Sequence, residues 1–279
     1  METVVTREQV EEAAAFVRAQ APQPLEFGVV LGSGLAKLAD AVEDARSIPF
    51  GDIPYFPISS VLGHSGRLII GQLEGRSVLV MQGRVHFYEG YSMSQVTLPI
   101  RMMQVLGVHT LILTNAAGGV NPAFKAGDVM LITDHVNLIG MAGQNPLRGP
   151  NDEAFGPRFP DMSQAYDRAL RDLALQVAVQ QQIDLKQGIY ICLAGPSFES
   201  PADVRFLRLI GADAVGMSTV PETVVARHGG LRVLGLSGIS NSLAGDSAAQ
   251  ETTHEEVLEA GRVLVPKMMT IIRGVLRAA

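Results

Sequence analysis

The sequence contains a single cysteine, Cys192, among its 279 residues. One cysteine cannot form a disulfide within the chain, and it cannot supply a cysteine-rich zinc site. No two histidines stand at the spacing with which one helix presents zinc ligands, so the sequence predicts no metal ion. We therefore expect a protein of a reducing compartment, the cytoplasm.

An excess of positive charge is also missing. Aspartate and glutamate number 28 against 22 lysines and arginines, which gives a net charge of -6. Non-specific binding to nucleic acid needs a basic surface, so nucleic acid is not an expected partner. A small anionic substrate stays open, because one local cluster of donors is enough to bind it.

Long hydrophobic runs are absent as well. No apolar run reaches the roughly 18 residues of a membrane-spanning helix, and the N-terminal segment lacks the basic-then-apolar layout of a signal peptide. There are no repeats, low-complexity segments or linkers, and the hydrophobic fraction of 47% suffices for a large core. These features predict a soluble protein, away from membranes, that folds as one domain over residues 1–279.

Short apolar runs alternate with amphipathic segments along the chain. Strands are expected at residues 27–31, 67–73, 77–81, 110–113, 129–133, 189–193 and 231–237. Helices are expected at residues 7–20, 35–42, 97–106, 163–180, from 201 onward and at 253–276. The alternation predicts an α/β fold with a mixed central sheet flanked by helices.

Capping and breaking signals support several of these helices. Thr6 with Gln9 has the spacing of a capping box, and Ser200 before Pro201 is typical of an N-cap and first helical residue. Pro266 should kink or interrupt the last helix, because proline lacks a backbone N–H and clashes with the preceding turn.

Polar and glycine-rich segments follow the apolar runs repeatedly. They lie at residues 32–34, 84–88, 115–119, 195–199, 216–218 and 240–241. In open α/β sheets, ligands bind outside the carboxyl ends of the strands. Six such segments together predict one composite pocket.

The segment at residues 84–88 has the most informative pattern, with Arg84, His86 and Tyr88 at alternate positions. In an extended chain these side chains point to one face. Arginine presents a rigid fork of donors that suits phosphate, and histidine adds a second donor. The pattern favours an anion site beside an aromatic wall; the alternative is a surface salt bridge with a packed histidine.

The other candidates each have an ordinary structural alternative. Ser33, between two glycines before a helix, could bind an oxyanion or cap a common turn, and its motif matches neither the P-loop nor the dinucleotide fingerprint. Glu199 could accept hydrogen bonds from a ligand on which Phe198 stacks, or only favour a helix end. Asn241 could bind a ligand or stabilise a turn. A lone loop histidine such as His64 is more often solvated than functional.

Taken together, these segments resemble the trimeric purine nucleoside phosphorylases. The matching motifs are LGSGL, GHSGRL, QGRVHFYEGY, TNAAGG, GQNPLRGPND, AGPSFES, DAVGMSTVPE, SNSLAG and THEEVL. They occur in order from about residue 25 to about residue 272, nearly the whole chain. The resemblance implies a nucleoside phosphorylase-like fold and the reversible phosphorolysis of purine nucleosides and deoxynucleosides, in purine salvage, to free base and (deoxy)ribose 1-phosphate.

The resemblance also implies roles for individual residues. Phosphate, a co-substrate rather than a cofactor, would be held by Ser33, His64, Arg84, His86, the Ala116 backbone N–H and Ser218. The nucleoside would contact Tyr88, Phe198, Glu199, Met217, Asn241 and His254, and His86, Glu199 and Asn241 would be catalytic. Phe159, in a long loop expected at residues 144–161, would complete a neighbouring subunit's site in a homotrimer.

The expected chemistry follows from the same resemblance. The glycosidic bond would break through an oxocarbenium-like transition state without a covalent intermediate. Glu199, as an acceptor, suits 6-oxopurines, which carry hydrogen at N1, so we expect inosine and guanosine to be preferred over adenosine. Ser240 replaces a threonine that is usual in the family, and its retained hydroxyl predicts little change.

Three other functions remain as alternatives. Methylthioadenosine phosphorylase shares the fold, but a base-binding aspartate and a more apolar 5′ pocket would be expected where this chain has Asn241 and His254. A non-catalytic nucleotide-binding protein would need no defined phosphate site. A nucleoside hydrolase would turn over without phosphate, and the sequence lacks the aspartate-rich calcium site expected of that class.

Overall fold

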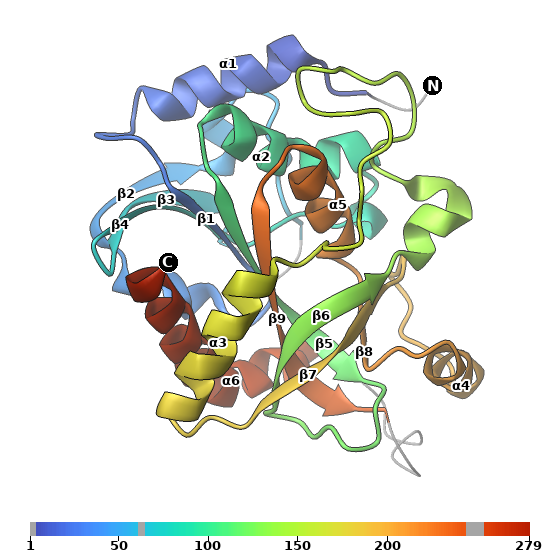
Figure 1. Ribbon diagram of the computed structural model, residues 1–279. Coiled ribbons are helices and arrows are strands. Elements are labelled where there is room, and N and C mark those ends of the chain that lie inside the picture. Colours follow the sequence, from blue (N-terminus) through green and yellow to red (C-terminus); the bar gives the residue numbers. More distant parts are fainter. Residues whose placement is uncertain (1–3, 61–64, 244–253) are drawn as a thin grey trace.

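The computed structural model describes residues 4–60, 65–243 and 254–279. Within these residues, nine strands form one mixed sheet in the order β2-β3-β4-β1-β5-β8-β7-β6-β9 (Figure 1). The strands are β1 Phe27–Leu31, β2 Glu43–Pro49, β3 Arg67–Leu73, β4 Arg76–Gln82, β5 Thr110–Gly119, β6 Val129–Val136, β7 Leu185–Cys192, β8 Ala214–Gly216 and β9 Arg232–Ser242. The single-domain α/β fold with a mixed sheet is therefore confirmed.

The second half of the sheet closes on itself. Strand β5 pairs with β8 on one side and with β9 along its length on the other. Because β8, β7, β6 and β9 are also joined in that order, these five strands form a ring. Strand β1 pairs in parallel with β5 on one side and with β4 on the other, so the ends of β1, β4, β5 and β9 lie at the same edge of the structure.

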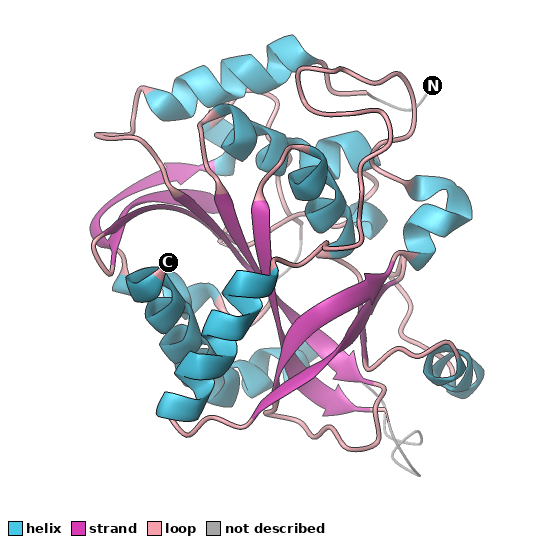
Figure 2. Cartoon of the chain, viewed as in Figure 1, coloured by secondary structure: helices cyan, strands magenta, loops and turns pink. Residues whose placement is uncertain are grey.

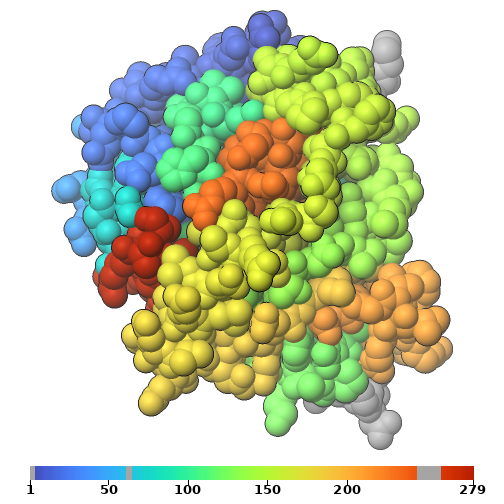
Figure 3. Space-filling model, in the orientation of Figure 1, coloured from blue at the N-terminus to red at the C-terminus, as the bar shows by residue number. Residues whose placement is uncertain are grey.

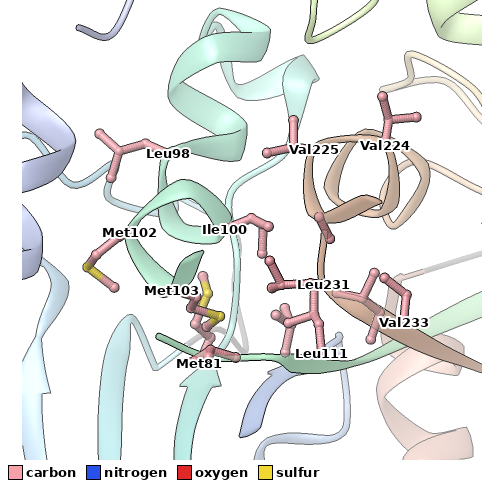
Figure 4. Close-up of a cluster of buried hydrophobic side chains, with 14 of the residues drawn as sticks. Met81, Leu98, Ile100, Met102, Met103, Leu111, Val224, Val225, Leu231 and Val233 are labelled. Atoms are coloured by element: carbon pink, nitrogen blue, oxygen red, sulfur yellow. The ribbon is translucent and has the colours of Figure 1, made fainter. Parts of the chain in front are cut away.

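Helices cover both sides of the sheet (Figure 2). They are α1 Arg7–Arg18, α2 Met93–Val105, α3 Arg168–Gln180, α4 Pro201–Leu209, α5 Val220–His228 and α6 His254–Ala278. Side chains of α2 and α5 meet over β4, β5 and β9 in a buried cluster that includes Met103, Val225 and Leu111 (Figure 4). A second cluster joins α3 and α6 to the other face. None of the described helices is long and apolar enough to cross a membrane.

Strand β1 illustrates why the sequence forms this layer. Phe27, Val29 and Leu31 pack with α3 and α6, whereas Val30 packs with α1 and α2. All five residues of the strand are buried, as expected for a strand covered on both faces. Alternating side chains thus supply both cores.

The helix signals are largely confirmed. Thr6 and Gln9 form the predicted capping box, and Ser200 caps α4 with Pro201 in the first turn. Helix α6 continues through Pro266 without interruption. Its length and its contacts with β9 and α3 hold it together, because tertiary packing supplies most of a helix's stability in proteins.

Several elements differ from the prediction. The segment expected to be helical at residues 35–42 forms the 3-10 helix Ala36–Ala41. Strand β2 was not predicted, because it is exposed at all but one position and carries no alternating apolar pattern. Helix α5 was also missed, because nearly all of its residues are buried and no polar face marks the helical period.

Candidate active site

Residues from all six predicted segments line one cavity of about 380 Å³ at the converging strand ends. Its walls include Ser33, Arg84, His86, Tyr88, Ala116, Phe198, Glu199, Met217, Ser218 and Asn241. The predicted convergence into a composite pocket is confirmed. Two segments are not loops, however: residues 115–119 belong to β5 and residues 240–241 to β9. These two strands continue beyond the ends that their apolar runs predicted, residues 113 and 237.

Gly32 brings two of these segments together. A Cβ atom at this position would lie 2.7 Å from the Cα of Asn115 and 2.9 Å from the carbonyl oxygen of Thr114. Only glycine lets the end of β1 approach β5 this closely. The Gly32 N–H also donates to Thr114 Oγ1 at 3.2 Å. Ser33 and Ala116 consequently face the same cavity.

Arg84 is buried, with 2% of its surface exposed, and is therefore not part of a surface salt bridge. Its Nη1 lies 3.1 and 3.0 Å from the two carboxylate oxygens of Glu222 and 3.3 Å from Thr219 Oγ1. Its Nη2 donates to the carbonyl oxygen of Thr114. A buried, fixed guanidinium at the cavity wall is the most direct sign of an anion site.

His86 is held by a carboxylate that sequence analysis did not identify. Glu89 Oε1 accepts the His86 backbone N–H at 2.7 Å and lies 3.2 Å from His86 Nδ1. Its Oε2 accepts from the Ser60 N–H at 2.6 Å. Burial opposes ionisation of Glu89, but hydrogen bonds from His86 and Ser60 outweigh it and lower its pKa to about 2. A glutamate three residues after His86 was the available sequence signal.

Residues 84–88 do not form the extended face that their alternation predicted. Strand β4 ends at Gln82, and Phe87–Glu89 form a 3-10 helix. The rings of His86 and Tyr88 nevertheless stack, with centroids 4.9 Å apart and planes inclined by 10°. Burial raises the pKa of Tyr88 to about 12, so its phenol stays protonated at neutral pH. The turn therefore brings Arg84, His86 and Tyr88 to the same cavity, as an extended strand would have done.

Another part of the wall carries the carboxylate and amide expected to contact a base. Burial raises the pKa of Glu199 from its ordinary value, and Asp203 adds to this shift. Phe198 beside it is half exposed. Gly195 has a φ of +67°, and a Cβ there would lie 2.4 Å from Met217 Sδ and 2.9 Å from Tyr88 Cδ1. This glycine thus leaves room for both side chains at the cavity.

A β-bulge at Ser240 orients Asn241. Ala117 pairs with Ile239 and Gly118 with Asn241, which leaves Ser240 as the extra residue of β9. The Ser240 hydroxyl lies 3.3 Å from the Ala117 carbonyl oxygen and 2.9 Å from Asn241 Oδ1. This hydrogen bond holds the amide oxygen of Asn241 toward Ser240 at the cavity wall. The hydroxyl that serine retains thus has a definite structural role.

Three predicted site residues are not brought to the cavity by the described structure. His64 lies outside the described residues, as does the side chain of His254, the first residue of α6. Phe159 is 87% exposed and lines a separate surface groove with Met141 and Arg158. The loop that carries it, coloured yellow-green, lies on the surface beside α1 and α5 (Figure 3).

Among the described residues, no three histidine, cysteine, aspartate or glutamate side chains form a set that could hold a metal ion. Cys192 is a buried free thiol, and burial raises its pKa well above the ordinary range. A buried protonated thiol is a poor nucleophile. The polar groups that line the cavity include hydrogen-bond donors for an anion, the Glu199 carboxylate and the Asn241 amide.

Comparison with known proteins identifies relatives of this chain. The model of the phosphorylase superfamily matches residues 26–277. Purine nucleoside phosphorylase 1 of Bacillus subtilis is 52% identical over 269 residues, which are 96% of this chain and 98% of that protein. The purine nucleoside phosphorylase of Rattus norvegicus is 51% identical over 96% of this chain and 94% of its own length.

Solved structures give the same result. The crystal structure of Schistosoma mansoni purine nucleoside phosphorylase in complex with inosine superimposes with a TM-score of 0.93 at 45% identity, and covers 99% of this chain and 98% of its own. A structure of the same protein with adenosine gives the same TM-score, identity and coverage.

Proposed function

Because this chain belongs to the purine nucleoside phosphorylases, pentosyltransferases of the phosphorylase superfamily, we propose that its cavity cleaves 6-oxopurine nucleosides with inorganic phosphate. The observation that carries the proposal is one cavity that combines Arg84 and His86 with Glu199 and Asn241. The first pair provides donors for an oxyanion. The second pair provides the acceptor and donor that a 6-oxopurine requires.

Phosphate would be bound by Arg84, His86, Ser33, Ser218 and the Ala116 N–H, all of which line the cavity. His64, outside the described residues, would be a further phosphate ligand. As the glycosidic bond lengthens, the ribose gains positive charge, and the bound phosphate stabilises it and then captures C1′. Because the donors are fixed before the reaction, they need no reorganisation as charge develops. No covalent intermediate and no cofactor is required.

The base would be recognised by Glu199 and Asn241, with Phe198 beside it. Asn241 would donate to the purine as negative charge develops at N7 and O6. Glu199 would accept the N1 hydrogen that hypoxanthine and guanine carry and adenine lacks. The related Schistosoma mansoni protein binds adenosine in a crystal, so we expect a preference in kcat/KM rather than exclusion of adenosine.

The sugar would lie against Tyr88 and Met217, which line the cavity, and His254 would bind its 5′-hydroxyl. Phe159 is exposed in this protomer, as a residue that completes a neighbouring subunit's site would be. We therefore include a homotrimer in the proposal, together with a cytoplasmic location, which the lone Cys192 favours.

The test is base release from inosine, guanosine, adenosine and methylthioadenosine, each with and without phosphate, with the sugar product identified. The proposal predicts ribose 1-phosphate from inosine and guanosine, only when phosphate is present. Free ribose without phosphate would identify a hydrolase, and absence of turnover a binding protein. A kcat/KM for methylthioadenosine above that for inosine would identify the related phosphorylase instead.

A further inference from the structure

Glu222 lies behind the anion-binding wall rather than in it. Its carboxylate is buried against Arg84, with side-chain exposures of 6% and 3%, and does not line the cavity. Both of its oxygens contact one terminal nitrogen of Arg84, at 3.1 and 3.0 Å. The orientation of this guanidinium therefore depends on a residue that phosphate would not touch.

The same carboxylate also fixes the turn before α5. Glu222 Oε2 accepts the backbone N–H of Thr219, three residues earlier. Thr219 has a φ of +72°, a left-handed conformation that a β-branched residue adopts only under constraint. Its hydroxyl accepts from Arg84 Nη1 and from Asn115 Nδ2, the latter at 2.9 Å. Ser218, the preceding residue, lines the cavity.

One buried carboxylate thus contacts the two parts of the wall that come from distant segments. Arg84 follows β4, and Ser218 and Thr219 are the last two residues before α5. Glu222 stands in the first turn of α5, where the helix dipole stabilises a negative charge. A bond to each part from a single group fixes their relative position.

We propose that Glu222 is a positioning residue for phosphate: it holds the Arg84 guanidinium and the Ser218–Thr219 turn in the arrangement that binds the anion. This inference rests on the proposed phosphate-binding role of Arg84. It differs from a purely structural role, because a buried ion pair that serves only the fold would change stability and leave substrate affinity unaltered.

The experiment compares the wild type with Glu222→Gln and Glu222→Ala. Val225→Ala is the matched control, since Val225 is a buried core residue of the same helix. Each protein is assayed for the KM of phosphate at saturating inosine and the KM of inosine at saturating phosphate. The rise in melting temperature on adding phosphate alone gives a readout independent of turnover.

Glu222→Gln is expected to raise the phosphate KM about tenfold, the factor typical of one charge-assisted hydrogen bond, and to reduce the phosphate-induced rise in melting temperature. The inosine KM should change less than about twofold. Glu222→Ala should give a larger effect in the same direction. Val225→Ala should lower the melting temperature while both KM values stay at the wild-type level.

An unchanged or lower phosphate KM in Glu222→Gln would overturn the inference. So would equal rises in both KM values, which would indicate general distortion. If Glu222→Ala does not fold, the near-isosteric glutamine variant still decides the question. If the wild type shows neither phosphate-dependent turnover nor phosphate-induced stabilisation, the proposed function itself fails, which is a different result.

Discussion

The hydroxyl of Ser240 lies 2.9 Å from Asn241 Oδ1, at the point where β9 bulges beside the cavity. This contact holds the amide oxygen of Asn241 toward Ser240 and so bears on which end of the amide meets a substrate. To donate to the purine, the Asn241 amide must turn its NH2 group, and not its oxygen, toward the base. The pair therefore links a local irregularity of the strand to recognition of the base.

Ser240→Ala should reduce activity and Ser240→Thr should retain it. Without the hydroxyl the amide oxygen loses this one hydrogen bond, and a buried hydrogen bond contributes about 0.5–1.5 kcal/mol. We expect kcat/KM for inosine to fall about three- to tenfold in the alanine variant. Steady-state kinetics of both variants measures the effect, and equal activity of all three proteins would show that the bond does not orient Asn241.

Asn241→Asp should shift the base preference toward 6-aminopurines. An aspartate oxygen can accept from the amino group of adenine but cannot donate to a 6-oxo group. The ratio of kcat/KM for adenosine to that for inosine should rise at least about tenfold, a difference near 1.4 kcal/mol in transition-state binding. Competition between the two nucleosides measures this ratio directly. If the ratio does not rise, Asn241 does not bind the base as proposed.

Glu89→Gln should weaken the site through His86. The carboxylate has a pKa of about 2 and is ionised at neutral pH, where it fixes the imidazole and accepts two hydrogen bonds from Ser60. Glutamine keeps the shape but loses the charge. We expect about a tenfold rise in the phosphate KM. Glu26→Gln is a suitable control, because the Glu26 side chain forms an ion pair with Arg76 and does not line the cavity. An unaltered phosphate KM in the Glu89 variant would contradict this role.

The ion pairs of Glu74 should make the free energy of unfolding depend on pH in the acid range. Hydrogen bonds from Arg277 and Arg273 of α6 lower its pKa from 4.5 to about 2, although burial opposes this. A lowered folded-state pKa stabilises the fold above pH 4.5, and this contribution is lost as pH falls from 4.5 toward 2. Urea unfolding should show Glu74→Gln less stable than wild type at pH 6, with the difference shrinking across that interval.

Salt provides the control for this prediction. Arg277 is 60% exposed, so its interaction with Glu74 should weaken as ionic strength rises. A difference between wild type and Glu74→Gln that stays constant from pH 6 to acid pH would show that the pairing does not stabilise the fold.

Local signals predicted the parts of the fold that depend on local chemistry. The capping box at Thr6 and the buried run of β1 are set by neighbouring residues, and both are confirmed. Strand β2 and helix α5 escaped prediction because one lies on the surface and the other is buried all round. In each case the hydrophobic period that marks an element is missing.

In the candidate site, too, local sequence signals predicted some features and not others. The strand-end segments pointed to a shared pocket, because the ends of neighbouring strands must meet. The group that holds Arg84 could not be predicted, since Glu222 is 138 positions away and only the folded chain brings them together. Glu89, three residues after His86, was within reach of local reasoning and was missed. The roles of His64, Phe159 and His254 rest on the resemblance and remain predictions.

The most direct test of the account is a crystal structure of the protein with phosphate and hypoxanthine bound together. We expect phosphate oxygens within about 3.2 Å of Arg84, Ser33, Ser218 and the Ala116 N–H. Hypoxanthine should lie with its N1 hydrogen toward Glu199 and its N7 and O6 edge toward Asn241. Phosphate bound away from Arg84, or a base with neither edge toward Glu199 and Asn241, would contradict it.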